Sequence, residues 1–450
     1  MPPVADPIGA YLHSSLTKHG TSGPEATILQ TKLQRALLSR VEFEPAERQH
    51  SHLLQQLQTK YIVLGERDGP SSGRPQPPIC LSKKSELRLG WGNASYPTGA
   101  GMVNLGNTCY LNSSLQALFH APALVRWLLE DSRHAARCGS SDQCTVCSMA
   151  RTLRSTHQRQ GGVVKPILIY SKLKLICKHL IHGRQEDAHE FVRHLLDSMQ
   201  RCHLLAMRAT KLDTLSKETT PLNHLFGGYL KTQVTCLRCH HASMTFQHFQ
   251  DLLVDVRQVS TVDDALHLYF KKERLDGADY KCERCRMKVP ATKKFFIDET
   301  PLVLCIQLKR FSLGGGKITK HVSFPNKLNV ARFMTRPPAQ GQVVYSLVSL
   351  INHMGPSQNC GHYTAMAKAA NGQVYLFDDA SVRMTSMGNM LNTNAYVLIY
   401  EMTSATRQLL LGPAPGEDCL LLFVSASILY HLSMALCCLI WRLRSAPSVV

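Results

Sequence analysis

The chain has 450 residues, of which 44% are hydrophobic and 18% charged, a composition that excludes collagen-like, coiled-coil and wholly disordered proteins. Its formal net charge of +19 favours acidic partners such as nucleic acid, nucleosomes or anionic surfaces, although a uniform solubilising charge would give the same total. The 16 cysteines are too few for a disulfide scaffold, and the polar N-terminal sequence is not a signal peptide, so we expect a reducing compartment.

The N-terminal part, residues 1–97, is predicted to be a low-structure leader and linker. Apolar residues recur at helical spacing within 26–57, and the run GPSSGRPQPP at 69–78 is typical of a linker. Dense apolar periodicity then continues to about residue 402. We therefore expect one large domain over 98–403.

The first half of this domain is predicted to be helical. Leu111, Leu115 and Leu118 fall on one helical face, and 188–199 has apolar residues at i, i+3, i+4 and i+7. The second half is strand-like, with candidate strands at 302–308, 345–351, 374–377 and 395–400. Helices that precede strands in this way predict an α+β fold rather than alternating βαβ units.

A candidate nucleophile lies in the run GNTCY at 106–110. Cys109 follows a Gly-Asn-Thr turn at the start of an amphipathic helix, where N–H groups and the helix dipole stabilise a thiolate. The pentapeptide alone is equally consistent with a buried structural cysteine. Asn104, five residues earlier, could donate to a developing oxyanion or could simply be a turn residue.

Two groups of residues have the spacing of metal ligands. The C-x-x-C pairs formed by Cys236 with Cys239 and Cys282 with Cys285 predict a four-thiolate Zn²⁺ site, which is structural because it leaves no open coordination position. A weaker pattern could form a second zinc site or could be loop thiols that cluster by chance; it consists of His134, Cys138, Cys144 and Cys147.

A cysteine hydrolase also needs a base and a residue that orients it. His362 begins a strand-like run, and Asp378 follows 16 residues later with the hairpin signal Asn371-Gly372 between them. A two-residue turn at that dipeptide would place Ser381 opposite His362, so a His362–Asp378 contact requires a longer loop or a bulge. Asp379 is the competing carboxylate.

The C-terminal tail, 404–450, contains an apolar run at 419–441 without Asp, Glu, Lys or Arg. This run is long enough to cross a bilayer. Arg442 and Arg444 follow it, and the positive-inside tendency would then conflict with a cytosolic catalytic domain. A membrane anchor is therefore the less favoured alternative to an interfacial helix or a tail of another role.

Six ordered stretches resemble the ubiquitin-specific protease family of cysteine-type deubiquitinases. They are GMVNLGNTCYLNS (101–113), GRQEDAHEF (183–191), the two C-x-x-C pairs, LCIQLKRF (304–311), CGHY (360–363) and YLFDD (375–379). The runs YSKLKLICKHL, FGGYL and FQHFQDLLVDVR look closest to the insect Scrawny-type, nucleolar branch of the family. That resemblance implies nuclear and nucleolar localisation with a cytoplasmic alternative, although the apolar tail replaces the basic extension common in this branch.

The resemblance implies a papain-like fold with thumb, palm and zinc-bearing fingers, the fingers over about 225–300. Cys109 would attack the carbonyl of ubiquitin's last glycine, with His362 as base, Asp378 as its partner and Asn104 as oxyanion donor. Asp187 and Glu190 match acidic residues that meet ubiquitin's basic tail. A capping role for Asp187 and a solvated side chain for Glu190 are the alternatives.

The predicted function is hydrolysis of the isopeptide bond between ubiquitin and lysine of proteins such as histones. A catalytically silent, ubiquitin-binding zinc-ribbon adaptor is the alternative from another class. The intact set of Cys109, His362 and Asp378 argues against silence. A nucleic-acid-binding protein is a third possibility, but the sequence lacks an interleaved aromatic pattern.

Overall fold

The computed structural model describes residues 74–411 except for 131, 140, 277–279, 312–315 and 358–359. The predicted helical stretch at 26–57 and the apolar run at 419–441 lie outside the described residues. Among the helices that are described, none has the length and apolar character needed to cross a membrane.

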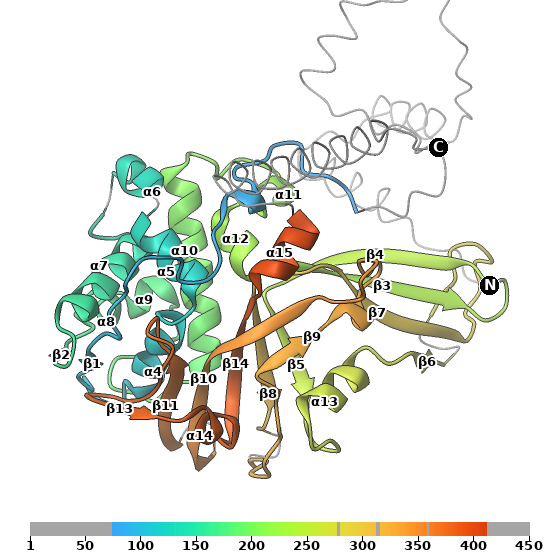
Figure 1. Ribbon diagram of the computed structural model, residues 1–450. Helices are drawn as coiled ribbons and strands as arrows, with labels where there is room; N and C mark the ends of the chain where they lie inside the picture. The colour runs from blue at the N-terminus through green and yellow to red at the C-terminus, as the bar shows by residue number, and fades with distance from the viewer. Residues whose placement is uncertain are drawn as a thin grey trace, which may run out of the picture. The chain divides into compact units, whose positions relative to one another are not determined.

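Helices gather on one side of the described unit (Figure 1). The longest of them, α10, spans Ala188–Ala206 and buries the predicted apolar stripe, and its Phe191 packs edge-on against Tyr110 with ring centroids 5.4 Å apart. The others on this side are α4 (Cys109–Leu118), α5 (Pro122–Glu130), α6 (Ser132–Arg137), α7 (Thr145–Gln158), α8 (Ile167–Tyr170), α9 (Leu173–Ile176), α11 (Thr214–Lys217) and α12 (Pro221–Phe226).

A large sheet lies next to this helical side, and its strand order is β13-β12-β11-β10-β14-β8-β5, with β9 paired to β10. All its pairings are antiparallel except that of β5 with β8. The strands are β5 (Asp251–Asp255), β8 (Val303–Lys309), β9 (Lys327–Asn329), β10 (Val344–Ser357), β11 (Cys360–Lys368), β12 (Val374–Asp378), β13 (Ser381–Thr385) and β14 (Ala395–Met402).

The helical side and the large sheet share one core. Every residue of β14 is buried, as expected of a central strand that is covered on both faces. Helix α4 packs against β11, and Ser349 Oγ of β10 donates to the carbonyl of Ala117 in α4 at 2.8 Å. This packing brings the segment that carries Cys109 beside the strand that carries His362, and the predicted α+β class is confirmed.

A separate four-stranded sheet extends away from the helices (Figure 1). Its order is β4-β3-β7-β6, and its strands are β3 (Gly228–Cys236), β4 (Ala242–Phe249), β6 (Glu273–Leu275) and β7 (Ala291–Glu299). Not all of the interval 225–300 belongs to this sheet. Strand β5 pairs instead with β8 of the large sheet, because its Leu252 and Val254 are fully buried there.

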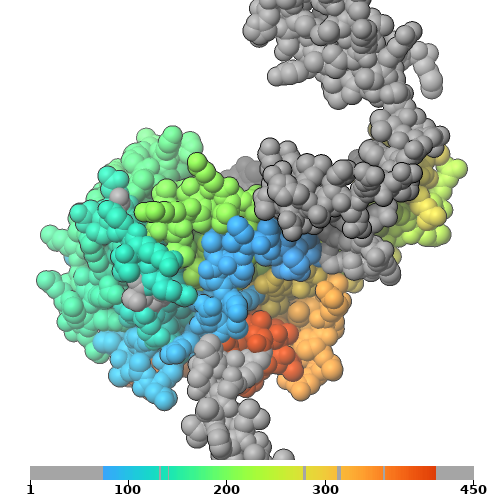
Figure 2. All heavy atoms as spheres, turned by 90° about the horizontal axis from the view of Figure 1, so that it is seen from above, coloured from blue at the N-terminus to red at the C-terminus, as the bar shows by residue number. Residues whose placement is uncertain are grey.

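The described end of the predicted leader, residues 74–97, is attached to the domain. Leu87 and Leu89 are buried, and Ser82 Oγ donates to the carbonyl of Thr219 at 2.8 Å. In the space-filling view this blue segment lies on the surface beside the red helix α15, which spans Ser404–Leu411 (Figure 2). The packed unit therefore begins before residue 98, with little regular structure in this stretch apart from a short 3-10 helix, Lys84–Glu86.

Candidate active site

Cys109 is the first residue of α4, and the turn before it is organised by the predicted Asn104. The Asn104 side-chain oxygen accepts the backbone N–H groups of Gly106 and Thr108, at 3.0 and 3.1 Å. Asn107 adopts a positive φ of 54°, which asparagine tolerates better than most residues. The Gly-Asn-Thr turn therefore delivers the thiol to the beginning of the helix, as the sequence predicted.

His362 lies in β11 and Asp378 ends β12, and the two side chains meet. His362 Nε2 is 2.6 Å from Asp378 Oδ1, and both side chains are about one-third exposed. The strands pair Ala365 with Phe377, because Ala369 and Gln373 close a three-residue loop. That loop is one residue longer than the two-residue turn considered from sequence, and the contact is diagonal across the hairpin.

The Cys109 sulfur is surrounded by groups from three segments. Gln185 Nε2 lies 3.8 Å from it, and the backbone N–H of Tyr363, the residue after His362, is near enough to lower its pKa. Gln185 also holds the strand, since its amide accepts the N–H of Gly361 at 3.2 Å and donates to the Gly361 carbonyl. In the described part of the chain, Cys109 and His362 share no direct hydrogen bond.

The surroundings of Cys109 shift its pKa in opposite directions. Burial raises the pKa of the Cys109 thiol, and the charge of Asp379 raises it further, against the lowering effect of the N–H groups of Tyr363, Tyr110 and Cys109 itself. Desolvation therefore opposes the thiolate stabilisation expected at the start of a helix, so a nearby base is needed to take the proton of Cys109.

Asp379 is connected to the predicted oxyanion donor. Its φ is 47°, in the two-residue turn that joins β12 to β13, and its carboxylate accepts Asn104 Nδ2 at 2.9 Å and Asn112 Nδ2 at 2.8 Å. Gly101 of the short strand β1 (Gly101–Met102) must approach this turn closely, because a Cβ there would lie 2.2 Å from the Ala380 carbonyl oxygen. Asp378 and Asp379 thus contact different catalytic candidates.

The two acidic residues proposed to meet ubiquitin's tail have different environments. Asp187 is buried; one carboxylate oxygen accepts the N–H of Glu190 at 2.9 Å as the N-cap of α10, and the other accepts the Tyr396 hydroxyl at 2.6 Å. Glu190 is exposed and lies 3.4 Å from His194. The capping role that sequence reasoning left open for Asp187 is present, and Glu190 is accessible to a basic partner.

Sequence reasoning did not single out Gln185 or Asn112. Gln185 joins the thiol to β11, and Asn112 is a buried amide that holds Asp379 from α4. Both lie inside the stretches that carry the family resemblance, GRQEDAHEF and GMVNLGNTCYLNS. Their place in these stretches was the only feature of the sequence that pointed to either residue. Their contacts join segments that are distant in sequence, so no local pattern predicts them.

The two C-x-x-C pairs meet at the far end of the four-stranded sheet, as predicted. The four sulfur atoms lie within 4.8 Å of one another, with Cys236 to Cys285 at 3.9 Å and Cys239 to Cys282 at 3.6 Å. The residues after the two pairs, His240 and Arg286, have matching positive φ values of 57° and 54°. This donor set and its closed arrangement fit a tetrahedral structural Zn²⁺.

Comparisons with known proteins agree with this geometry. Residues 100–400 match the family described as "Ubiquitin carboxyl-terminal hydrolase". "Ubiquitin carboxyl-terminal hydrolase 36" of Drosophila pseudoobscura pseudoobscura is 44% identical over 420 residues, covering 82% of this chain and 40% of that protein. The Drosophila grimshawi protein of the same name is 50% identical over 338 residues, covering 73% of this chain and 27% of that protein. The chain thus spans at most 40% of either relative.

Solved structures give the same likeness. The SAGA Ubp8/Sgf11/Sus1/Sgf73 DUB module bound to ubiquitin aldehyde contains a chain with a TM-score of 0.60 and 27% identity, covering 68% of this chain and 70% of that chain. A variant of the same module, bound to monoubiquitin, gives a TM-score of 0.60 and 26% identity, covering 78% of this chain and 74% of that chain. The predicted thumb, palm and fingers fold is confirmed.

Proposed function

The chain belongs to the ubiquitin carboxyl-terminal hydrolase family, and we propose that it is a thiol-dependent deubiquitinase that hydrolyses the isopeptide bond between ubiquitin's C-terminal glycine and lysine of a substrate protein. One observation carries the proposal. His362 of β11 pairs with Asp378 of β12 at 2.6 Å, and Gln185, which bonds Gly361 next to His362, lies 3.8 Å from the Cys109 sulfur. This proximity supports the assignment of a nucleophile, a base and an orienting carboxylate.

In the proposed reaction, His362 takes the proton of the Cys109 thiol. Its partner, Asp378, fixes the imidazole tautomer and stabilises the imidazolium that forms. The thiolate attacks the glycine carbonyl to form a tetrahedral oxyanion; His362 then protonates the leaving lysine amine, and water resolves the thioester. Because burial raises the pKa of the Cys109 thiol, a base beside it promotes formation of the thiolate.

Asn104 is the proposed oxyanion donor, and Asp379 is its positioning residue. The Asn104 side-chain oxygen is held by two backbone N–H groups, so its amide nitrogen has one defined direction. That nitrogen donates to Asp379 in this structure. A donor whose orientation is fixed before the reaction stabilises the oxyanion more than one that must reorganise.

The first test is turnover and covalent labelling of the purified full chain. We expect release of a fluorophore from a ubiquitin C-terminal amide and cleavage of an isopeptide-linked diubiquitin. A ubiquitin bearing a C-terminal electrophile should modify Cys109, as mapped by peptide mass spectrometry. Ubiquitin binding without turnover would favour the silent adaptor, and labelling at Cys360 alone would contradict the site.

Replacing Asp378 and replacing Asp379 are expected to have different effects on kcat and on the pKa of Cys109. Asp378→Asn should lower kcat about 10²–10⁴-fold, because His362 loses its charged partner. Asp379→Asn should lower kcat about 10-fold through Asn104, and it should also lower the pKa of Cys109, because the Asp379 charge raises that pKa. Iodoacetamide alkylation of Cys109 measured against pH should therefore shift to lower pH in Asp379→Asn only; the same shift in Asp378→Asn would contradict these roles.

We further propose that the thiolates of the two C-x-x-C pairs in the fingers hold Zn²⁺. We also propose that the substrates are nuclear or nucleolar proteins such as histones. The +19 net charge supports acidic partners, since chromatin is polyanionic. The chain should then cleave ubiquitinated nucleosomes faster than a ubiquitin amide at low salt. An advantage that does not change between low and high salt would count against an electrostatic origin.

A further inference from the structure

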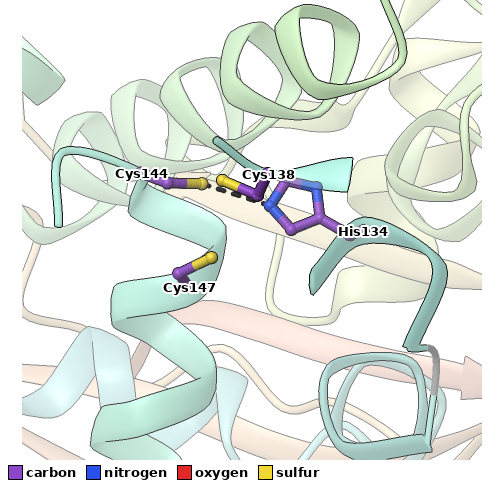
Figure 3. A group of neighbouring side chains, drawn as sticks. All are labelled: His134, Cys138, Cys144 and Cys147. Atoms are coloured by element: carbon purple, nitrogen blue, oxygen red, sulfur yellow. Dashed lines mark hydrogen bonds between the residues drawn. The ribbon is translucent and has the colours of Figure 1, made fainter. Parts of the chain in front are cut away.

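A second group of metal-ligating side chains lies in the helical part of the molecule, apart from the residues of the active site and the fingers (Figure 3). His134 belongs to α6, Cys138 directly follows that helix, Cys144 is the N-cap of α7, and Cys147 lies in its first turn. The four side chains point toward one another, and their ligand atoms lie within 4.8 Å of one another. The two segments therefore converge on one point.

The spacing of these atoms is close to that of a zinc tetrahedron. With Zn–S near 2.3 Å and Zn–N near 2.0–2.1 Å, the ligand atoms of a tetrahedral site are separated by about 3.5–3.8 Å. His134 Nε2 is already 3.2 Å from Cys144 Sγ. Movements of about 1 Å or less would bring the remaining atoms to this geometry, and one imidazole with three thiolates is a known structural zinc set.

The fingers site of the same molecule shows the same local design. There, the Cys236 sulfur accepts the backbone N–H of Cys239, the second cysteine of its C-x-x-C pair, at 3.4 Å. In the helical group, Cys144 and Cys147 form the corresponding C-x-x-C pair at the start of α7. In each group two ligands are buried and two are half-buried. The two groups therefore share a C-x-x-C pair and the same pattern of burial.

The structure around this group indicates what a metal would stabilise there. The connection between α6 and α7 contains the run GSSDQ at 139–143, which has no apolar side chain to anchor it. Helix α6 has six residues, and helices of this length are marginal without tertiary support. The His134 ring stacks on His203 of α10, with ring centroids 5.5 Å apart and 18° between planes. A metal here would attach α6 and its following loop to α7 and α10.

We propose that His134, Cys138, Cys144 and Cys147 bind a second structural Zn²⁺. The four protein ligands leave no open coordination position, so this ion orders the helical part and takes no part in hydrolysis. Binding displaces one proton from each of the three thiols. The site stands independently of the proposed activity, because zinc content is measured without any substrate.

The test is the zinc content of the purified full chain, measured by elemental mass spectrometry. We expect two Zn²⁺ per chain in the wild type, one in Cys138→Ser and Cys147→Ser, and one in Cys282→Ser, which loses the fingers ion instead. Cys202→Ser is the matched control, since its sulfur accepts the Thr145 N–H at 3.4 Å next to the group but is not one of its four ligands. One zinc in the wild type, or two in Cys138→Ser, would overturn the proposal.

A measurement on the wild type alone covers the case in which these variants do not fold. Zinc should protect Cys138, Cys144 and Cys147 from iodoacetamide, and chelation should expose all three together, as mapped by mass spectrometry. If the cysteines are protected because two of them form a disulfide, the peptide mass will be lower by two hydrogens. That result would show a redox pair at this position and would contradict the zinc site. Rapid alkylation of the three thiols before chelation would equally refute it.

Discussion

Cys109→Ser is expected to lower turnover of a ubiquitin C-terminal amide about 10⁴-fold or more while ubiquitin affinity changes by less than a few-fold. A serine hydroxyl has a far higher pKa than a thiol, and His362 cannot make it a comparable nucleophile in one step. Cys109 is 3% exposed and its sulfur lies 3.8 Å from Gln185 Nε2, so a nearly isosteric hydroxyl should preserve the packing. Steady-state kinetics and equilibrium ubiquitin binding measure the two effects separately.

The matched control for this prediction is Cys360→Ser. Cys360 is an exposed thiol two residues before His362, and no hydrogen bond joins it to the Cys109 sulfur among the described residues. Its replacement should leave turnover within about two-fold, and it should remove any oxidation chemistry that depends on a second exposed thiol. Turnover near the wild-type level in Cys109→Ser, or its loss in Cys360→Ser, would show that the nucleophile is misassigned.

The sequence predicted the elements that carry the site because their apolar patterns are local. The stripe over 188–199 is α10, and the continuous apolar run at 395–400 is the fully buried strand β14. The C-x-x-C pairs were equally easy to recognise, since each pair is a complete local motif. The local sequence leaves open only which other pair shares the metal. Each of these features can be recognised without knowing what the chain packs against.

The contacts between segments were less predictable for physical reasons. Asn371-Gly372 indicates a hairpin but does not fix its loop length; here Asn371 Oδ1 accepts the N–H of Gln373 at 3.0 Å inside a three-residue loop, which sets the register of His362. The pKa of Cys109 depends on burial beneath Gln185 and on the charge of Asp379, both from distant parts of the chain. Local sequence around a cysteine cannot report either effect.

Loss of the fingers metal is expected to have the largest effect on stability. Apart from its four cysteines, the apolar cluster at the end of the four-stranded sheet contains Val289 and the partly buried Tyr280. Such a small cluster cannot offset the entropy of ordering both C-x-x-C loops, whereas a structural zinc contributes folding free energy directly. Cys282→Ser should therefore destabilise the fingers by on the order of 5 kcal/mol and lower their Tm by about 10 °C or more.

The same variant separates a structural metal from a catalytic one. Cys282→Ser should weaken ubiquitin binding, because the fingers are expected to grip the body of ubiquitin, while iodoacetamide still alkylates Cys109 at the wild-type rate. Arg238→Ala is the matched control, since Arg238 lies inside a C-x-x-C pair and contacts Met287 without being a ligand. It should keep the zinc and the Tm. If Cys282→Ser loses one zinc but unfolds at the wild-type temperature, the fingers are held together by the β3–β7 pairing rather than by the metal.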